Sequence, residues 1–255
     1  MNWKTFTAML ARDAHVARRN VLTLVLQTML QPLLFMFIFG QVMIRSGMMN
    51  TVYRSILLPG IMATTMLMAG IQAVSMPVII EFMTKEIEDR LLAPMHMRWL
   101  VVEKIVAGMA ISLLSGLFVL PVGWLIMGRN TGATLEHSGL LIVIMLLVAL
   151  LSASSGLVMG CSVGQAHIGL LFSMVLAPMI MFGCAYYPWS ALQGFPILRW
   201  AVLINPMVYA SEGLRSALAP QVAHMPLAVV ISLLCAMNLA LVMFGINRFY
   251  KKAVT

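Results

Sequence analysis

The stretch that decides the fold is residues 139–187, which read GLLIVIMLLVALLSASSGLVMGCSVGQAHIGLLFSMVLAPMIMFGCAYY. These 49 residues contain no Asp, Glu, Lys or Arg. A single helix of this length would be roughly 70 Å long, more than twice the thickness of the hydrocarbon core of a bilayer. The stretch therefore predicts two membrane-spanning helices, with the turn between them at residues 160–169.

The whole chain has the composition of an integral membrane protein. Of its 255 residues, 62% are hydrophobic and only 9% are charged, whereas soluble domains carry about 25% charged residues. The length allows about six spans with short loops. The formal net charge is +8, which in a membrane protein indicates anchoring of cytoplasmic segments rather than binding of nucleic acid.

Apolar runs place the other spans. Residues 1–19 predict an amphipathic helix in the membrane interface, because basic side chains gather on one face and Trp3 and Phe6 lie on the other. Residues 188–226 are too often interrupted by proline and charge to form a span. Eleven Lys and Arg residues on the expected inner segments, against five outside, predict cytoplasmic termini. The remaining spans are expected at 21–43, 56–80, 100–127 and 227–246.

The predicted spans lack the residues that catalysis or proton transport needs. Glu103 and Lys104 lie at a cytoplasmic end, and no nucleophile with a base is visible at membrane depth. The five His residues fall in predicted loops or interfaces, and Cys161, Cys184 and Cys235 lie in apolar stretches. We therefore expect no catalytic, metal or cofactor site. The chain contains no G-x-x-x-x-G-K-[ST] phosphate loop, so ATP hydrolysis is expected in another chain.

Small residues recur at four-residue spacing in two of the spans. This spacing lets helix backbones approach closely. We interpret it as packing within the chain, with a subunit interface as the alternative. The residues are Ser152, Gly156, Gly160 and Gly164 in one span and Gly108, Ser112 and Gly116 in the other.

The most charged stretch, residues 81–99, has the pattern of a docking helix. Its sequence KEIEDRLLAPMHMRW combines charge with the Leu91–Leu92 pair and is stopped by Pro94. A short amphipathic helix displayed between two spans is suited to a groove on a partner protein, and a solvated loop is the alternative.

Three regions resemble the membrane subunit of ABC-2 type exporters, in the same order along the chain. A basic amphipathic helix precedes the first span. Residues 86–105, EIEDRLLAPMHMRWLVVEKI, are similar to the charged family motif that ends in Leu-Leu-x-x-Pro, although Ile87 stands where the family often has Gly. Residues 186–218, YYPWSALQGFPILRWAVLINPMVYASEGLRSAL, resemble the family signature between the last two spans. The resemblance covers essentially the whole chain.

The resemblance implies an all-α fold with six transmembrane helices, in which residues 1–255 form one ABC-2 type transmembrane domain. Two such subunits, expected to be a homodimer, would each bind a separate cytoplasmic ABC ATPase that holds ATP and Mg. The expected location is the bacterial inner membrane. Residues 82–98 would be the coupling helix seated on the ATPase, and residues 188–210 the short re-entrant helices at the outer surface.

The resemblance also assigns candidate site residues. The expected coupling residues are Glu86, Glu88, Asp89, Arg90, Leu91, Leu92 and Pro94. The expected residues of the substrate path are Gln27, Gln31, Phe35 and Gln72, with simple helix packing as the alternative for each. The re-entrant motif comprises Pro188, Pro196, Asn205, Pro206, Tyr209, Glu212 and Arg215.

Within that motif, Glu212 and Arg215 are expected to form a structural pair near the outer surface. Asn205 and Pro206 are expected to end one short helix and begin the next.

The expected function is export of an amphipathic or lipid-like molecule, a class that in this family includes drugs, glycolipids and polysaccharides. Only 8% of the chain is aromatic, which favours a lipid-like substrate over a sugar chain stacked on aromatic rings. The alternative is a passive channel or structural membrane subunit that needs no nucleotide. An intramembrane enzyme is a weaker alternative, because no nucleophile–base set is present.

Overall fold

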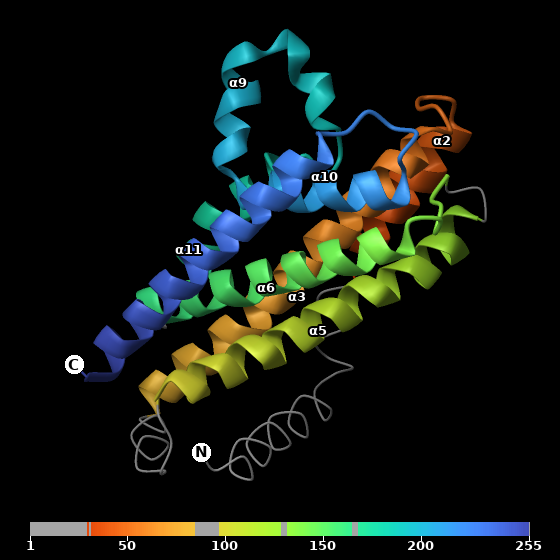
Figure 1. Ribbon diagram of the computed structural model, residues 1–255. Coiled ribbons are helices and arrows are strands. Elements are labelled where there is room, and N and C mark those ends of the chain that lie inside the picture. The colour runs from red at the N-terminus through yellow and green to blue at the C-terminus, as the bar shows by residue number, and fades with distance from the viewer. Residues whose placement is uncertain (1–29, 31, 85–96, 129–131, 165–167, 255) are drawn as a thin grey trace.

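The computed structural model describes residues 30, 32–84, 97–128, 132–164 and 168–254. In this part of the chain every regular element is helical, and four helices are long and apolar enough to cross a membrane. They lie side by side and slant in a common direction (Figure 1). The four are α3 (Tyr53–Met83), α5 (Met97–Met127), α6 (Ser138–Ser162) and α11 (Leu227–Val254).

Helix α3 is the centre of this bundle and packs against both α5 and α6. Gly156 of α6 permits a close approach of the two main chains, since a Cβ atom there would lie 2.7 Å from the carbonyl oxygen of Ile71. Between α5 and α3, the Ser112 hydroxyl donates a hydrogen bond of 2.8 Å to the carbonyl of Met66. These contacts confirm that the small residues pack the chain's own helices together. Such close packing is expected in a bilayer, because the lipid is as apolar as the helices and gives no hydrophobic drive for their association. Gly164 is the exception, with no atom near its Cβ position.

The first and fifth predicted spans are described only in part. An apolar helix covers Pro32–Arg45, and it ends in the π-helical turn η1 (Ile38–Val42) followed by α2 (Met43–Arg45). The fifth segment consists of α7 (Ile168–Leu171), η3 (Phe172–Leu176) and α8 (Ala177–Met181). Six spans therefore remain a prediction, as four helices in the described residues have the necessary length.

Two helix ends differ from the sequence-based expectation. The fifth segment leaves the helix after Met181, although its apolar run continues to residue 187. The reason is tertiary, because Cys184 has a φ of 53° and the carbonyls of Gly183 and Cys184 accept side-chain hydrogen bonds. Helix α11 continues past the expected limit of 246 to Val254, with Lys251 and Lys252 in its last turn, where cations complement the helix dipole.

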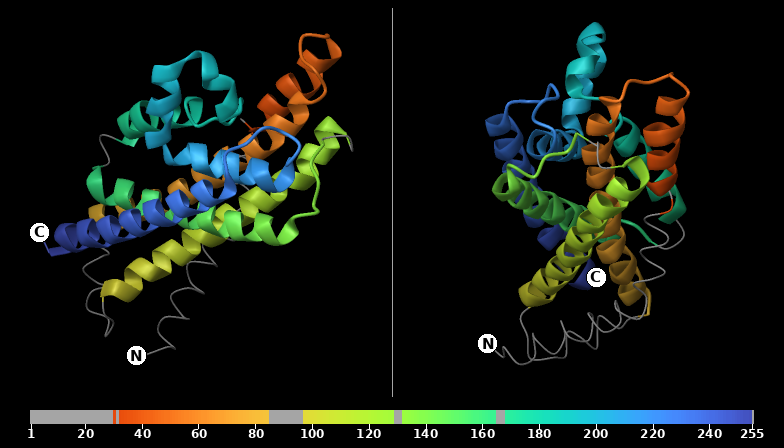
Figure 2. Two further views of the ribbon diagram at one scale, coloured as in Figure 1. Left: turned by 45° about the horizontal axis from the view of Figure 1, so that its top comes forward. Right: turned by 90° about the vertical axis from the view of Figure 1, so that its right-hand side faces the viewer.

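Between the fifth segment and α11 the chain forms a series of short helices. They are η4 (Trp189–Gly194), α9 (Pro196–Ala201), η5 (Val202–Ile204) and α10 (Pro206–Leu218). Figure 2 shows η4 and α9 as a hairpin that projects from the bundle, while α10 lies across its base. The short helices expected at 188–210 are thus present, and α10 extends beyond that range to Leu218.

This hairpin leaves the bundle where its backbone touches α3. The Tyr53 hydroxyl donates a hydrogen bond of 3.0 Å to the carbonyl of Tyr186. At Gly60 the contact is tighter, because an ideal Cβ atom would lie 1.7 Å from the carbonyl oxygen of Ala185. Only glycine fits at this point of α3.

We predict that Gly60→Ala destabilises the protein, since two main chains must separate to admit one methyl group. The expected loss is about 1–3 kcal/mol, measured as a lower thermal midpoint in detergent. Gly139→Ala is the control, because nothing lies near its Cβ position at the start of α6. Equal midpoints for the two variants would contradict the contact.

Candidate functional site

The projecting hairpin is held by an ion pair with no exposed surface. The side chains of Glu212 and Arg215, one turn apart on α10, are both 0% exposed and in direct contact. Glu212 also accepts hydrogen bonds of 2.9 Å from the backbone N–H groups of Trp189 and Met225. Arg215 donates one of 2.8 Å to the carbonyl of Cys184. The pair therefore fixes the chain on both sides of α10.

Asn205 holds the next part of the same unit. Its side-chain oxygen accepts a hydrogen bond of 3.0 Å from the N–H of Met207 and so caps α10, while its amide donates one of 2.7 Å to the carbonyl of Met179. Pro206 occupies the first turn of α10, where the missing N–H costs nothing. The expectation that Asn205 and Pro206 separate two short helices is confirmed.

The hairpin itself is closed by one aromatic contact. The Arg199 guanidinium lies 4.1 Å from the ring centre of Trp189, whose indole N–H donates a hydrogen bond of 3.1 Å to the Arg199 carbonyl. The cation–π contact and the hydrogen bond link η4 to α9.

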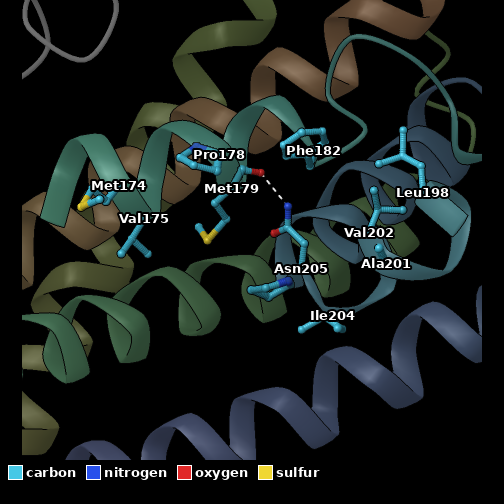
Figure 3. Close-up of a pocket in the computed structure, with 11 residues that line it drawn as sticks. Met174, Val175, Pro178, Met179, Phe182, Leu198, Ala201, Val202, Ile204 and Asn205 are labelled. Carbon is cyan, nitrogen blue, oxygen red and sulfur yellow. Dashed lines mark hydrogen bonds between the residues drawn. The ribbon is translucent and has the colours of Figure 1, made fainter. Parts of the chain in front are cut away.

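A groove of about 530 Å³ lies between the fifth segment and these short helices. Figure 3 shows Met174, Val175 and Met179 on one side and Leu198 and Val202 on the other, with the Asn205 amide between them. This volume is within the range of small-molecule sites. Apolar walls with a single amide suit a hydrophobic chain or ring better than a charged group. The groove is also lined by Pro178, Phe182, Ala201, Ile204 and Pro206.

An aromatic cluster lies where the first apolar helix meets the base of the hairpin. The rings of Phe35 and Phe39 stack with centroids 5.6 Å apart, and Phe35 is 5.0 Å from the ring of Tyr186. Phe35 therefore packs against other aromatic rings, and its place in the substrate path stays a prediction. Gln72 lies in the middle of α3 and is partly exposed.

At the opposite end of the bundle, ionic contacts join the helices that flank residues 85–96. Lys104 of α5 donates a hydrogen bond of 2.7 Å to Glu81 of α3, and both side chains are buried. Lys252 of α11 donates to the carbonyls of Gly160 and Val163, at 3.2 and 3.4 Å, and so caps α6. Its ammonium also lies 4.8 Å from the ring centre of Phe82 on α3. Four helices are thus tied together at this end.

Among the described residues, no group of three His, Cys, Asp or Glu side chains is placed to hold a metal ion.

A family model described as ABC-2 type transporter matches residues 4–219. The chain belongs to the ABC-2 type transporter family. It has no match among curated proteins or among solved structures. As an ABC-2 membrane subunit with several apolar helices, it is a multi-pass membrane protein and the transport component of its complex, and its family implies an ABC ATPase partner.

The ABC-2 subunit brings all seven residues of the predicted re-entrant motif into one unit. Pro188 precedes η4, Pro196 begins α9, and the Tyr209 hydroxyl donates a hydrogen bond of 2.7 Å to the carbonyl of Leu203. The other four are the Asn205–Pro206 helix start and the Glu212–Arg215 pair. The predicted contact within this pair is present and buried in protein, and its place near the outer surface stays a prediction.

Two groups of predicted site residues lie outside the described residues. They are Gln27 and Gln31 of the expected substrate path, and the whole expected coupling set of Glu86, Glu88, Asp89, Arg90, Leu91, Leu92 and Pro94. Their roles stay predictions.

Ser211 and the groove were not predicted from the sequence. The Ser211 hydroxyl donates a hydrogen bond of 2.6 Å to the carbonyl of Gly183, next to the contact that Arg215 makes with Cys184. Its position four residues before Arg215, on the same face of α10, was the available signal. The groove had no such signal in the sequence, because its two walls come from separate segments.

We predict that Glu212→Gln destabilises the subunit by about 3–5 kcal/mol, because it leaves the Arg215 charge buried without a counter-ion. Burial lowers the pKa of the Arg215 guanidinium, and the Glu212 carboxylate opposes that effect. The measurement is the thermal midpoint together with the monodisperse fraction in detergent. Glu136→Gln, which removes the same charge from an exposed residue, should leave both unchanged. A Glu212→Gln variant as stable as this control would show that the pair is dispensable.

Proposed function

We propose that this chain is the permease subunit of an ATP-driven exporter of amphipathic or lipid-like molecules. The observation that carries the proposal is the match of the ABC-2 transporter model over residues 4–219. In the proposed complex the chain pairs with a second copy of itself in a bacterial inner membrane, with both termini in the cytoplasm. Each copy binds an ABC ATPase that supplies ATP and Mg, because the chain has no phosphate-binding loop of its own.

The proposed coupling segment, residues 82–98, joins the ends of α3 and α5. The Glu81–Lys104 contact links these two helices beside the segment. A displacement of the segment would therefore move α3 and α5 together rather than bend one of them. The Lys252 contacts extend the same connection to α6 and α11. This arrangement supports transmission of an ATPase movement into the bundle.

The groove supports the proposed substrate class. Its walls are apolar, and it is bordered by exposed side chains such as Phe182 and Ile204. An amphipathic molecule would place its apolar part between α8 and α9, with its polar part left in water. A highly charged substrate would find no counter-ion among the groove residues.

We predict that the purified subunit retains an ABC ATPase. A triple variant with Glu86→Gln, Asp89→Asn and Arg90→Gln should weaken this retention by roughly tenfold, because it removes charges from the proposed interface. The measurement is nucleotide hydrolysis and stoichiometry after gentle extraction. The control carries Arg45→Gln and Glu136→Gln, which remove an exposed charge of each sign at the other end of the bundle. Retention that is identical in both variants would place the ATPase elsewhere. If no ATPase is retained even by the unmodified protein, the passive channel becomes the better account.

We predict that Ala201→Trp slows transport, because the indole fills the groove that Ala201 lines. The expected reduction is roughly tenfold, equivalent to about 1.4 kcal/mol of lost binding. It is measured as uptake of fluorescent amphipathic substrates into inverted vesicles that contain the whole complex. Ala191→Trp is the control, since Ala191 is exposed on the same hairpin but does not line the groove. Unimpaired transport by Ala201→Trp would remove the groove from the substrate path.

A further inference from the structure

A second cavity lies at the end of the bundle opposite the hairpin, where α5 begins and α11 ends. It has a volume of about 630 Å³ and is lined by Arg98, Trp99 and Val102 of α5 and Tyr250 of α11. Figure 1 shows the start of α5 and the end of α11 at the same end of the bundle, away from α9. The cavity is thus far from the groove beside Asn205.

The lining residues have the chemistry of a phosphate site at a membrane surface. Arg98 is exposed and makes no ion pair with the described residues. A guanidinium binds phosphate oxygens through paired hydrogen bonds. Trp and Tyr side chains favour the headgroup region of a bilayer, where one end of each ring is wet. The hydroxyl of Tyr250 adds a donor from the second helix.

The charge of the described residues around the cavity favours an anion. Helix α11 contains no acidic residue, and its last turns carry Arg248, Lys251 and Lys252. On α5 the nearby acidic residue is Glu103, which is buried, and Glu81 on α3 is paired with Lys104. Basic pockets between membrane helices on the cytoplasmic side are suited to anionic lipid headgroups.

An apolar strip continues from the cavity along α5. Val102 and Val106 follow Arg98 at four-residue spacing, so all three lie on one face of the helix. Val102 is 38% exposed and Val106 is 40% exposed. This strip offers a path for an acyl chain beneath the phosphate, and a free phosphate ion would make no use of it.

We propose that this cavity binds an anionic phospholipid, with its phosphate on Arg98 and Tyr250 and an acyl chain along Val102 and Val106. Helix α11 packs mainly on α6 and only slightly on α5, so the lipid bridges two helices that otherwise have little contact. The proposal rests on the proposed topology, in which this end of the bundle faces the cytoplasm, and it does not depend on ATP hydrolysis or on the exported substrate.

The test is native mass spectrometry of the full-length protein in neutral detergent, with equal amounts of phosphatidylglycerol and phosphatidylcholine. The unmodified protein should retain phosphatidylglycerol preferentially. Arg98→Gln should reduce this preference about fivefold, the effect of about 1 kcal/mol per basic residue near a lipid surface. Arg45→Gln, an equal loss of charge at the other end, should leave it unchanged. Arg98→Lys should keep most of it.

A second variant tests the cavity without removing a charge. Val102→Trp should displace the lipid, while Leu125→Trp, at a position 85% exposed on the same helix, should not. Glycerol phosphate should fail to compete, because it lacks an acyl chain. Equal retention of the two lipids by the unmodified protein would overturn the proposal, as would equal effects of Arg98→Gln and Arg45→Gln. Displacement of the lipid by glycerol phosphate would reassign the cavity to soluble phosphates.

Discussion

The buried contact between Glu212 and Arg215 sets the arrangement of the whole hairpin end. Its carboxylate binds the start of η4 and the chain before α11, and its guanidinium binds the chain after α8. A buried ion pair contributes little net stability compared with apolar packing, but it tolerates few alternative geometries. Here the Glu212 carboxylate and the Arg215 guanidinium bind backbone N–H and carbonyl groups that have no hydrogen-bond partner within a helix. The short helices can therefore leave the bundle and return to it while their backbone polar groups stay satisfied.

Most of the helices could be predicted from the sequence because their determinants are local. Helices α3, α5 and α6 each contain an apolar run long enough to cross a bilayer, and their ends lie within a few residues of the expected limits. The start of α10 was predictable from Asn205 and Pro206 because a cap and a first-turn proline act on their own neighbours. Glu212 and Arg215 were recognisable as a pair because they are one turn apart.

The parts that could not be predicted depend on contacts between distant segments. The apolar run itself continues to Tyr187, and the helix end after Met181 is held by Ser211 and Arg215 of α10, which bind the carbonyls of Gly183 and Cys184. The groove beside Asn205 has one wall from residues 174–182 and another from 198–206, and neither wall is amphipathic in a recognisable way. The contact of Phe35 with Tyr186 could not be predicted either, because the two residues are far apart in the sequence and only the fold brings them together.

Helix α3 makes the contacts that matter at both ends of the protein. Near its start, Tyr53 and Gly60 touch the base of the hairpin, and near its end Glu81 and Phe82 meet Lys104 and Lys252. Its 31 residues span about 46 Å. Pro59 and Pro77, each of which removes a backbone hydrogen bond, lie next to these two contact points and leave the 17 residues between them unbroken. Bending of α3 is therefore expected at these two prolines and not between them, so that the central part of the helix moves as one rigid body.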